Sequence, residues 1–152
     1  MPERPPIAVD PVLITGLVEQ LVSIPSVNPS LIPGAPGEGD VARCLAAVCE
    51  RLGMAVTLEE VAPRRPNVIA VIPGTEPARG RSLMLNGHTD TVGAAGMDAP
   101  FVPSQREGRL FGRGSVDMKA SLAAMVGAAA AQREAGVAPL GDRKSTRLNS
   151  SH

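Results

Sequence analysis

The 152-residue chain contains no tryptophan and no tyrosine, and only two phenylalanines. Because it has few aromatic side chains on which bases could stack and a formal net charge of +0, it lacks the usual features of a nucleic-acid-binding protein. We therefore expect no nucleic-acid partner. The hydrophobic fraction of 43% is that of a globular protein, which excludes a disordered chain or a fibre and predicts a core of aliphatic residues and alanine.

Long hydrophobic runs are also missing. No apolar stretch approaches the ~20 residues needed to cross a bilayer, and residues 1–6 (MPERPP) lack the pattern of a signal peptide, so we expect no membrane partner. The two cysteines, Cys44 and Cys49, are spaced neither as a CxxC motif nor as a helical metal pair. We interpret both as small buried or half-buried thiols, which favours a cytoplasmic location.

Lysine is scarce in residues 1–141, which contain one lysine, Lys119, and eleven arginines. Residues 142–152 (DRKSTRLNSSH) depart from that composition and back-translate into DNA that resembles a common sequencing-library adapter read in frame. A natural polar C-terminus is the alternative, because disorder concentrates at chain ends. We expect residues 142–152 to be non-native and exclude them from the fold prediction. Residues 1–141 are then one domain of a gene that is cut short.

Apolar residues at helical spacing predict three helices. The first covers roughly residues 11–22, with Asp10 as the N-cap and proline at the first helical position. The second begins with Asp40 as its N-cap and ends at Leu52, before a glycine at the usual stop position. The third covers residues 118–135 and is rich in alanine.

Other segments have the patterns of strands. Residues 56–61 and 67–72 are predicted strands joined by a turn, and the two adjacent glutamates of the first are interpreted as edge charges. Residues 83–85 form an unbroken apolar run, which is typical of a strand covered on both faces. Residues 101–111 are interpreted as a polar hairpin that turns at residues 107–108. Strands interspersed with helices predict an α/β layered domain.

The loop after residues 83–85 carries His88 and Asp90, and His88 is the only histidine upstream of residue 142. In extended backbone, side chains two residues apart lie on one face, where the carboxylate could orient the imidazole or sit beside a shared metal. Loops at the carboxyl ends of strands are where α/β sheets usually place their sites. A surface hydrogen-bonded pair is the alternative for these two residues.

Asp117 is the next candidate. Two glycines precede it and a predicted helix follows, so the backbone can approach a ligand closely there. A carboxylate that bridges two divalent cations needs such a supported position, whereas an ordinary N-cap aspartate fits the same pattern. Lys119 is interpreted as a solvated residue on the surface of that helix.

Residues 87–92 (GHTDTV) and 110–119 (LFGRGSVDMK) together resemble the paired signature of the M20 metallopeptidase family, which includes acetylornithine deacetylase, succinyl-diaminopimelate desuccinylase and glutamate carboxypeptidase. The similarity extends through residues 21–29 and 65–70, and so covers nearly all of residues 11–140. A departure is Ala120, where the family usually has glycine. The resemblance implies that residues 1–141 are the truncated N-terminal portion of a zinc-hydrolase catalytic domain, with a central mixed sheet flanked by helices.

The resemblance also implies a site. His88 would ligate one metal of a two-zinc centre, with Co²⁺ as a substitute, Asp117 would bridge both metals, and Asp90 would support His88 as a catalytic residue. The family's general base, a glutamate, and its remaining ligands would lie downstream, as would a lid or dimerisation domain of a parent protein that could be a homodimer. We therefore expect this 152-residue chain to be inactive by itself.

The sequence thus predicts a metal-dependent hydrolase that cleaves an amide bond. Its substrate would be an N-acyl amino acid that loses its acyl group, or a small peptide that loses its C-terminal residue. Two alternatives stay open: a non-catalytic relative used for binding or assembly, and an unrelated α/β binding domain in which His88 is structural. The residues that would select the substrate are expected downstream.

Overall fold

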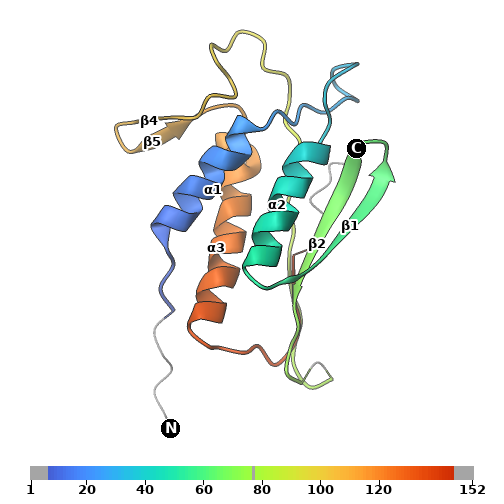
Figure 1. The fold of residues 1–152 in the computed structure, drawn as a ribbon, viewed down its shortest axis with the longest axis vertical. Coiled ribbons are helices and arrows are strands. Elements are labelled where there is room, and N and C mark those ends of the chain that lie inside the picture. Colours follow the sequence, from blue (N-terminus) through green and yellow to red (C-terminus); the bar gives the residue numbers. More distant parts are fainter. Residues whose placement is uncertain (1–6, 77, 146–152) are drawn as a thin grey trace.

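The computed structural model describes residues 7–76 and 78–145 of the chain (Figure 1). Its α-helices are α1 (Pro11–Ser23), α2 (Gly39–Arg51) and α3 (Ala120–Glu134). Its strands are β1 (Ala55–Ala62), β2 (Arg65–Ile72), β3 (Leu83–Leu85), β4 (Ser104–Arg106), β5 (Arg109–Phe111) and β6 (Arg143–Ser145). A π-helical turn, Ser115–Lys119, leads directly into α3.

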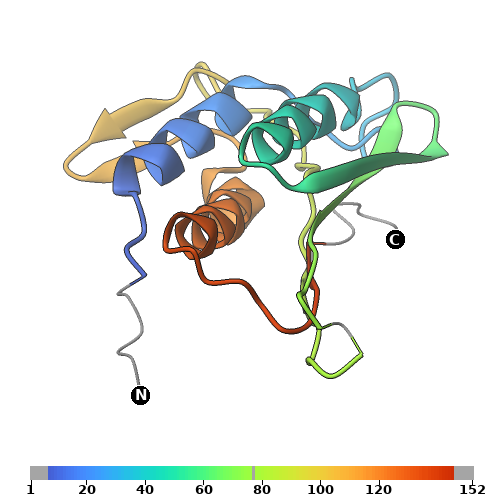
Figure 2. The same cartoon turned by 60° about the horizontal axis from the view of Figure 1, so that its bottom comes forward.

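One mixed sheet has the strand order β1-β2-β6-β3. β1 pairs with β2 in an antiparallel hairpin, β6 is antiparallel to β2, and β3 is parallel to β6. Helix α2 packs against β1 and β2, while α1 and α3 pack against each other (Figure 2). β4 and β5 form a separate hairpin that turns at Glu107 and Gly108, as predicted. The expected α/β architecture with a mixed sheet and flanking helices is confirmed.

The helix ends agree with the prediction at one place and differ at another. Asp10 caps α1, since its Oδ1 accepts a hydrogen bond from the backbone N–H of Val12 at 2.8 Å. The predicted capping role of Asp40 is wrong: α2 begins at Gly39, with Glu38 in the N-cap position. Asp40 lies in the first turn of the helix, where a negative charge still interacts favourably with the helix dipole.

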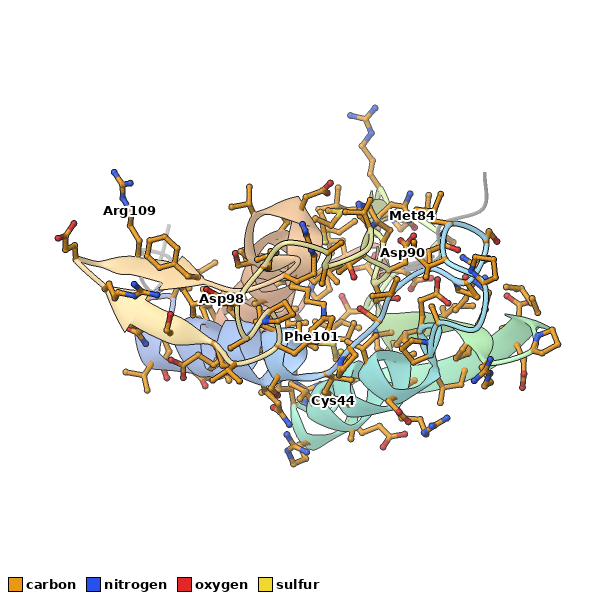
Figure 3. The ribbon with its side chains drawn as sticks, turned by 90° about the horizontal axis from the view of Figure 1, so that it is seen from above. Cys44, Met84, Asp90, Asp98, Phe101 and Arg109 are labelled. Atoms are coloured by element: carbon orange, nitrogen blue, oxygen red, sulfur yellow. The ribbon has the colours of Figure 1, made fainter. Side chains whose placement is uncertain are left out.

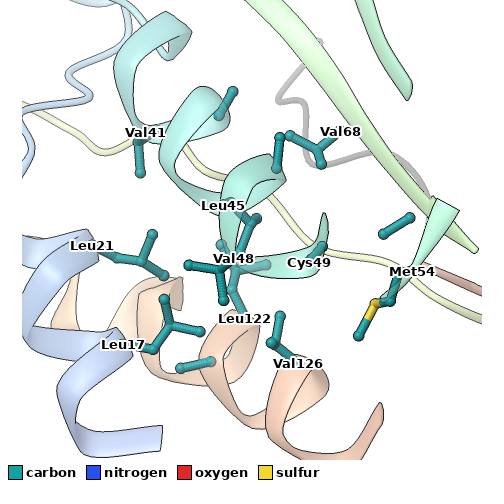
Figure 4. Close-up of a cluster of buried hydrophobic side chains, with 14 of the residues drawn as sticks. Leu17, Leu21, Val41, Leu45, Val48, Cys49, Met54, Val68, Leu122 and Val126 are labelled. Carbon is teal, nitrogen blue, oxygen red and sulfur yellow. The ribbon is translucent and has the colours of Figure 1, made fainter. Parts of the chain in front are cut away.

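The core is aliphatic, as the shortage of aromatic residues predicts. Buried side chains from all three helices meet there, and Val68 of β2 adds to them (Figure 4). Leu21, Leu45 and Leu122 each expose 1% or less of their surface. Burial of one such leucine stabilises the folded state by roughly 1.5–3 kcal/mol. The helical layer is therefore a stable support for the loops above it.

Strand β3 does not have the predicted environment. The apolar run of residues 83–85 predicted a strand covered on both faces, yet Leu83 is 47% and Met84 63% exposed. That prediction is wrong because β3 is the last strand in the sheet order, and among the described residues only β6 pairs with it. An apolar run shows what a strand could bury, but the neighbouring elements decide how much of it is buried.

Three residues of the segment expected to be non-native lie in the sheet. Arg143–Ser145 form β6, which pairs with residues 70–72 of β2 on one side and with β3 on the other. Strand pairing uses backbone N–H and C=O groups, so it is open to most sequences without proline. The origin of residues 142–152 stays a prediction, and residues 146–152 lie outside the described part of the chain.

Both cysteines are free thiols, Cys44 half-buried and Cys49 buried, as predicted. Burial away from water raises the pKa of the Cys49 thiol to about 11, so it is protonated and unreactive at neutral pH. Within residues 7–76 and 78–145, no helix combines the length and the apolar character needed to cross a bilayer.

Candidate metal centre

His88 lies in the loop that follows β3, and its side chain is about one-third exposed, at 34%. Its Nδ1 atom is directed at Asp90, 3.0 Å from the carboxylate Oδ1 and 3.2 Å from the backbone carbonyl oxygen. The hydrogen-bond geometry favours the carbonyl, and Oδ1 is buried without a hydrogen bond among the described residues. Both oxygens are acceptors, so the tautomer with the hydrogen on Nδ1 can donate to them and leaves the lone pair on Nε2.

Asp90 is only 7% exposed and lies inside the molecule, in contrast to Arg109, which points away from it (Figure 3). Its second carboxylate oxygen, Oδ2, accepts a hydrogen bond from the Nδ2 atom of Asn28 at 2.8 Å. A carboxylate held from one side and placed behind a histidine is the usual arrangement for orienting a metal-binding imidazole.

Asp117 reaches the same histidine from the other side. It belongs to the π-helical turn and has extended rather than helical backbone angles, φ −122° and ψ 99°. Its side chain is 83% exposed, and Oδ1 lies 3.0 Å from Nε2 of His88. The N-cap of α3 is Lys119, which makes no side-chain capping bond, so the alternative of an ordinary N-cap aspartate is wrong.

Close packing brings the Asp117 turn onto the His88 loop. Gly114 has φ +81°, and a Cβ atom at this position would lie 2.7 Å from Cγ2 of Thr91 and 3.2 Å from Cδ of Lys119. Only glycine adopts this conformation without strain and also leaves room for the neighbouring loop. The two glycine-flanked motifs therefore meet around one cavity of about 270 Å³, lined by His88, Asp90 and Asp117.

The pair of His88 and Asp117 has the chemistry of a cation site. When Nδ1 carries the hydrogen, a nitrogen lone pair and a carboxylate oxygen face each other at 3.0 Å, and this contact needs a positive charge between them. A proton or a divalent cation supplies one, and two ligands of one tetrahedral zinc ion would lie about 3.3 Å apart. Within the described part of the chain, no group of three or more His, Cys, Asp or Glu side chains is arranged to hold a metal. The described residues therefore fit part of a metal site.

Lys119 is not the solvated residue that was predicted. Its side chain is fully buried, and Nζ donates to the carbonyl oxygens of Leu21 and Ile24, at 2.8 Å each. Burial lowers the pKa of this ammonium group to about 8, while nearby Cys44 acts weakly in the opposite direction. Lys119 thus ties the Asp117 turn to the end of α1. The one signal of this buried role in the sequence is that Lys119 is a single lysine among the arginines of residues 1–141.

The comparisons with known proteins agree with this geometry. The sequence profile of Peptidase family M20/M25/M40 matches residues 84–144, which include both glycine-flanked motifs. An N-formyl-4-amino-5-aminomethyl-2-methylpyrimidine deformylase of Halalkalibacterium halodurans is 36% identical over 115 residues, covering 73% of this chain and 26% of its own length. A succinyl-diaminopimelate desuccinylase of Burkholderia multivorans is 40% identical over 119 residues, covering 74% of this chain and 29% of its own length.

The fold has solved counterparts as well. An M20 family metallo-carboxypeptidase of Sulfolobus solfataricus superposes with a TM-score of 0.74 at 21% identity, over 88% of this chain and 30% of its own. The chain therefore spans between a quarter and a third of the length of these proteins. Sequence profile, relatives and fold agree: this chain is similar to peptidase family M20/M25/M40 in sequence over residues 84–144 and to its solved members in fold.

Proposed function

We propose that this chain is part of a metal-dependent hydrolase that cleaves an amide bond, with His88 and Asp117 as metal ligands and Asp90 as the residue that orients His88. The observation that carries the proposal is the 3.0 Å contact between Nε2 of His88 and Oδ1 of Asp117, with Nδ1 directed at Asp90. A histidine oriented by a carboxylate presents its other nitrogen as a metal ligand.

The proposed metal is zinc, two ions per complete site, with Co²⁺ as a substitute. Bound divalent ions would polarise an amide carbonyl and lower the pKa of a water molecule. The residues of this chain would supply the ligand geometry: Asp90 would fix the direction of the imidazole, and the second oxygen of the 83% exposed Asp117 carboxylate would be the ligand of a second ion. The relatives are named as an N-formyl deformylase and a desuccinylase, and both names describe the removal of an acyl group, which supports an N-acyl substrate; a small peptide is the related alternative.

Two ligands hold zinc weakly compared with the four of a complete tetrahedral site. Because the described residues bring together only His88 and Asp117, we propose that the 152-residue chain alone binds metal weakly and does not hydrolyse amides. A homodimeric parent protein is part of the same proposal. A cytoplasmic location is also proposed, and the two free thiols support it.

The test is a Co²⁺ titration of the chain followed by visible absorption, with Zn²⁺ competition. The background variant His152→Gln leaves His88 as the one histidine in the sequence. His88→Ala and Asp117→Ala are each expected to weaken binding by about 100-fold or more, and Asp90→Asn by about 10–100-fold.

Asp98→Ala is the matched control, because it removes an exposed carboxylate outside the cavity lining and should leave the affinity unchanged. Equal Co²⁺ affinity of the parent chain, His88→Ala and Asp117→Ala would contradict the assignment and favour a structural role for His88.

A further inference from the structure

Residues 26–28, which follow α1, hold the His88 loop in place. The backbone N–H of Thr91 donates to the carbonyl of Ser26 at 2.8 Å, and the N–H of Asn28 donates to the carbonyl of Thr91 at 3.0 Å. These bonds form an isolated parallel bridge between Val27 and Thr91. The loop with the candidate ligand is therefore fixed by a segment more than sixty residues earlier in the chain.

Two side chains of this segment extend the bridge. Ser26 Oγ donates to the carbonyl of Thr89 at 2.8 Å, and Asn28 Nδ2 donates to Oδ2 of Asp90 at 2.8 Å. Ser26 is 0% exposed, Asn28 6% and Asp90 7%, so water cannot readily take over either contact. A buried acceptor that loses its donor cannot bond to water instead, so the loss destabilises the fold by most of the desolvation penalty of that group.

The orientation of the Asn28 amide is fixed by a second bond. Its Oδ1 accepts from the backbone N–H of Ser30 at 2.8 Å. An amide has its acceptor on oxygen and its donors on nitrogen, so the Ser30 contact leaves the donor end facing Asp90. An aspartate at position 28 could keep the bond from Ser30, but it would turn an oxygen toward the Asp90 carboxylate.

We propose that Asn28 is a positioning residue of the candidate metal centre. By donating to Oδ2 it fixes the Asp90 carboxylate, and Asp90 holds the imidazole of His88 with Nε2 directed at Asp117. The inference rests on the proposed function, in which Nε2 of His88 is the atom that binds the metal. Each step is one short contact, so a change of donor at the Asn28 side chain is expected to reach Nε2 through Asp90.

The experiment measures the ring tautomer of His88 by long-range ¹H–¹⁵N NMR on the metal-free chain. The His152→Gln background leaves only the His88 signals, and a pH of about 9 keeps an ordinary imidazole neutral. The parent chain is expected to show mainly the Nδ1–H tautomer. Asn28→Asp and Asn28→Leu are each expected to lower the ratio of Nδ1–H to Nε2–H by about fivefold or more, the factor for losing one hydrogen bond.

Ser26→Ala is the matched control, because it removes the neighbouring hydrogen bond of the same bridge and leaves Asn28 and Asp90 intact. Its tautomer ratio should equal that of the parent. A folded Asn28 variant with the parent's ratio overturns the proposal. Should neither variant fold, the parent spectrum decides, since a dominant Nε2–H tautomer overturns it too. The readout needs no metal, so it is independent of the Co²⁺ titration: a chain that fails to bind Co²⁺ but shows the Asn28 effect contradicts the proposed function alone.

Discussion

The Nζ atom of Lys119 lies 2.8 Å from the carbonyl oxygen of Leu21, near the end of α1 and 98 residues away in sequence. The contact fixes the last residue of the π-helical turn that carries Asp117. A charged ammonium group inside the protein is stabilised by such carbonyls but has lost its water, and its pKa is lowered to about 8 for that reason.

Lys119 should therefore give the protein a measurable pH dependence. The pKa in the folded state is below the ordinary 10.5, so the unfolded chain binds more protons between pH 8 and pH 10.5. Folding stability contributed by this group rises with pH across that window and is lowest below pH 8. Relative to Lys119→Met, the parent chain should gain about 3 kcal/mol between pH 8 and pH 10.5. Urea unfolding of both proteins at each pH measures the difference, and a constant difference would refute the expectation.

Gly114→Ala should destabilise the chain through the contact between the two motif loops. The residue has φ +81°, and the new methyl group would lie 2.7 Å from Thr91. We expect a loss of about 2–4 kcal/mol from backbone strain and overpacking together. Gly108→Ala is the matched control: it has φ +71° but nothing within 4 Å, so only the strain of about 1–2 kcal/mol applies. Equal losses of unfolding free energy would show that the loop contact is not tight.

The buried pair of Glu38 and Arg65 should contribute far more than its exposed counterpart. The guanidinium donates to both Glu38 oxygens, with Nε–Oε2 at 2.9 Å and Nη2–Oε1 at 2.8 Å, and Glu38 is 1% exposed. Glu38→Gln is expected to lower the free energy of unfolding by about 3–5 kcal/mol, because it leaves the charge of Arg65 without its buried partner charge. Asp40→Asn breaks the exposed Asp40–Arg43 pair and should cost less than about 1 kcal/mol. Thermal unfolding of the two variants gives the comparison, and similar costs would contradict it.

The features that depend on neighbours in sequence were predicted correctly. The Asp10 cap of α1 and the turn at residues 107–108 depend on a few adjacent residues, and both are found as predicted. The grouping of His88, Asp90 and Asp117 also followed from the sequence, because two ordered motifs indicated a common site. Their roles as ligands and orienting residue stay predictions.

Distant contacts account for what the sequence did not reveal. The burial of Lys119 depends on the end of α1, and the exposure of β3 depends on where the sheet order ends. Asn28 has no local pattern that marks it, since its partner Asp90 is 62 residues away. Hydrophobic periodicity and capping rules describe one segment at a time, so they carry no information about such pairs.

The bridge between residues 26–28 and 89–91 has a consequence for the order of events during folding. It closes a loop of more than sixty residues, and the entropic cost of that closure is met only when the helices between and around it have packed. We expect the His88 loop to reach its final geometry later than an isolated turn or hairpin would. We therefore expect assembly of the candidate metal centre to be a late step of folding, completed only when the described domain has folded as a whole.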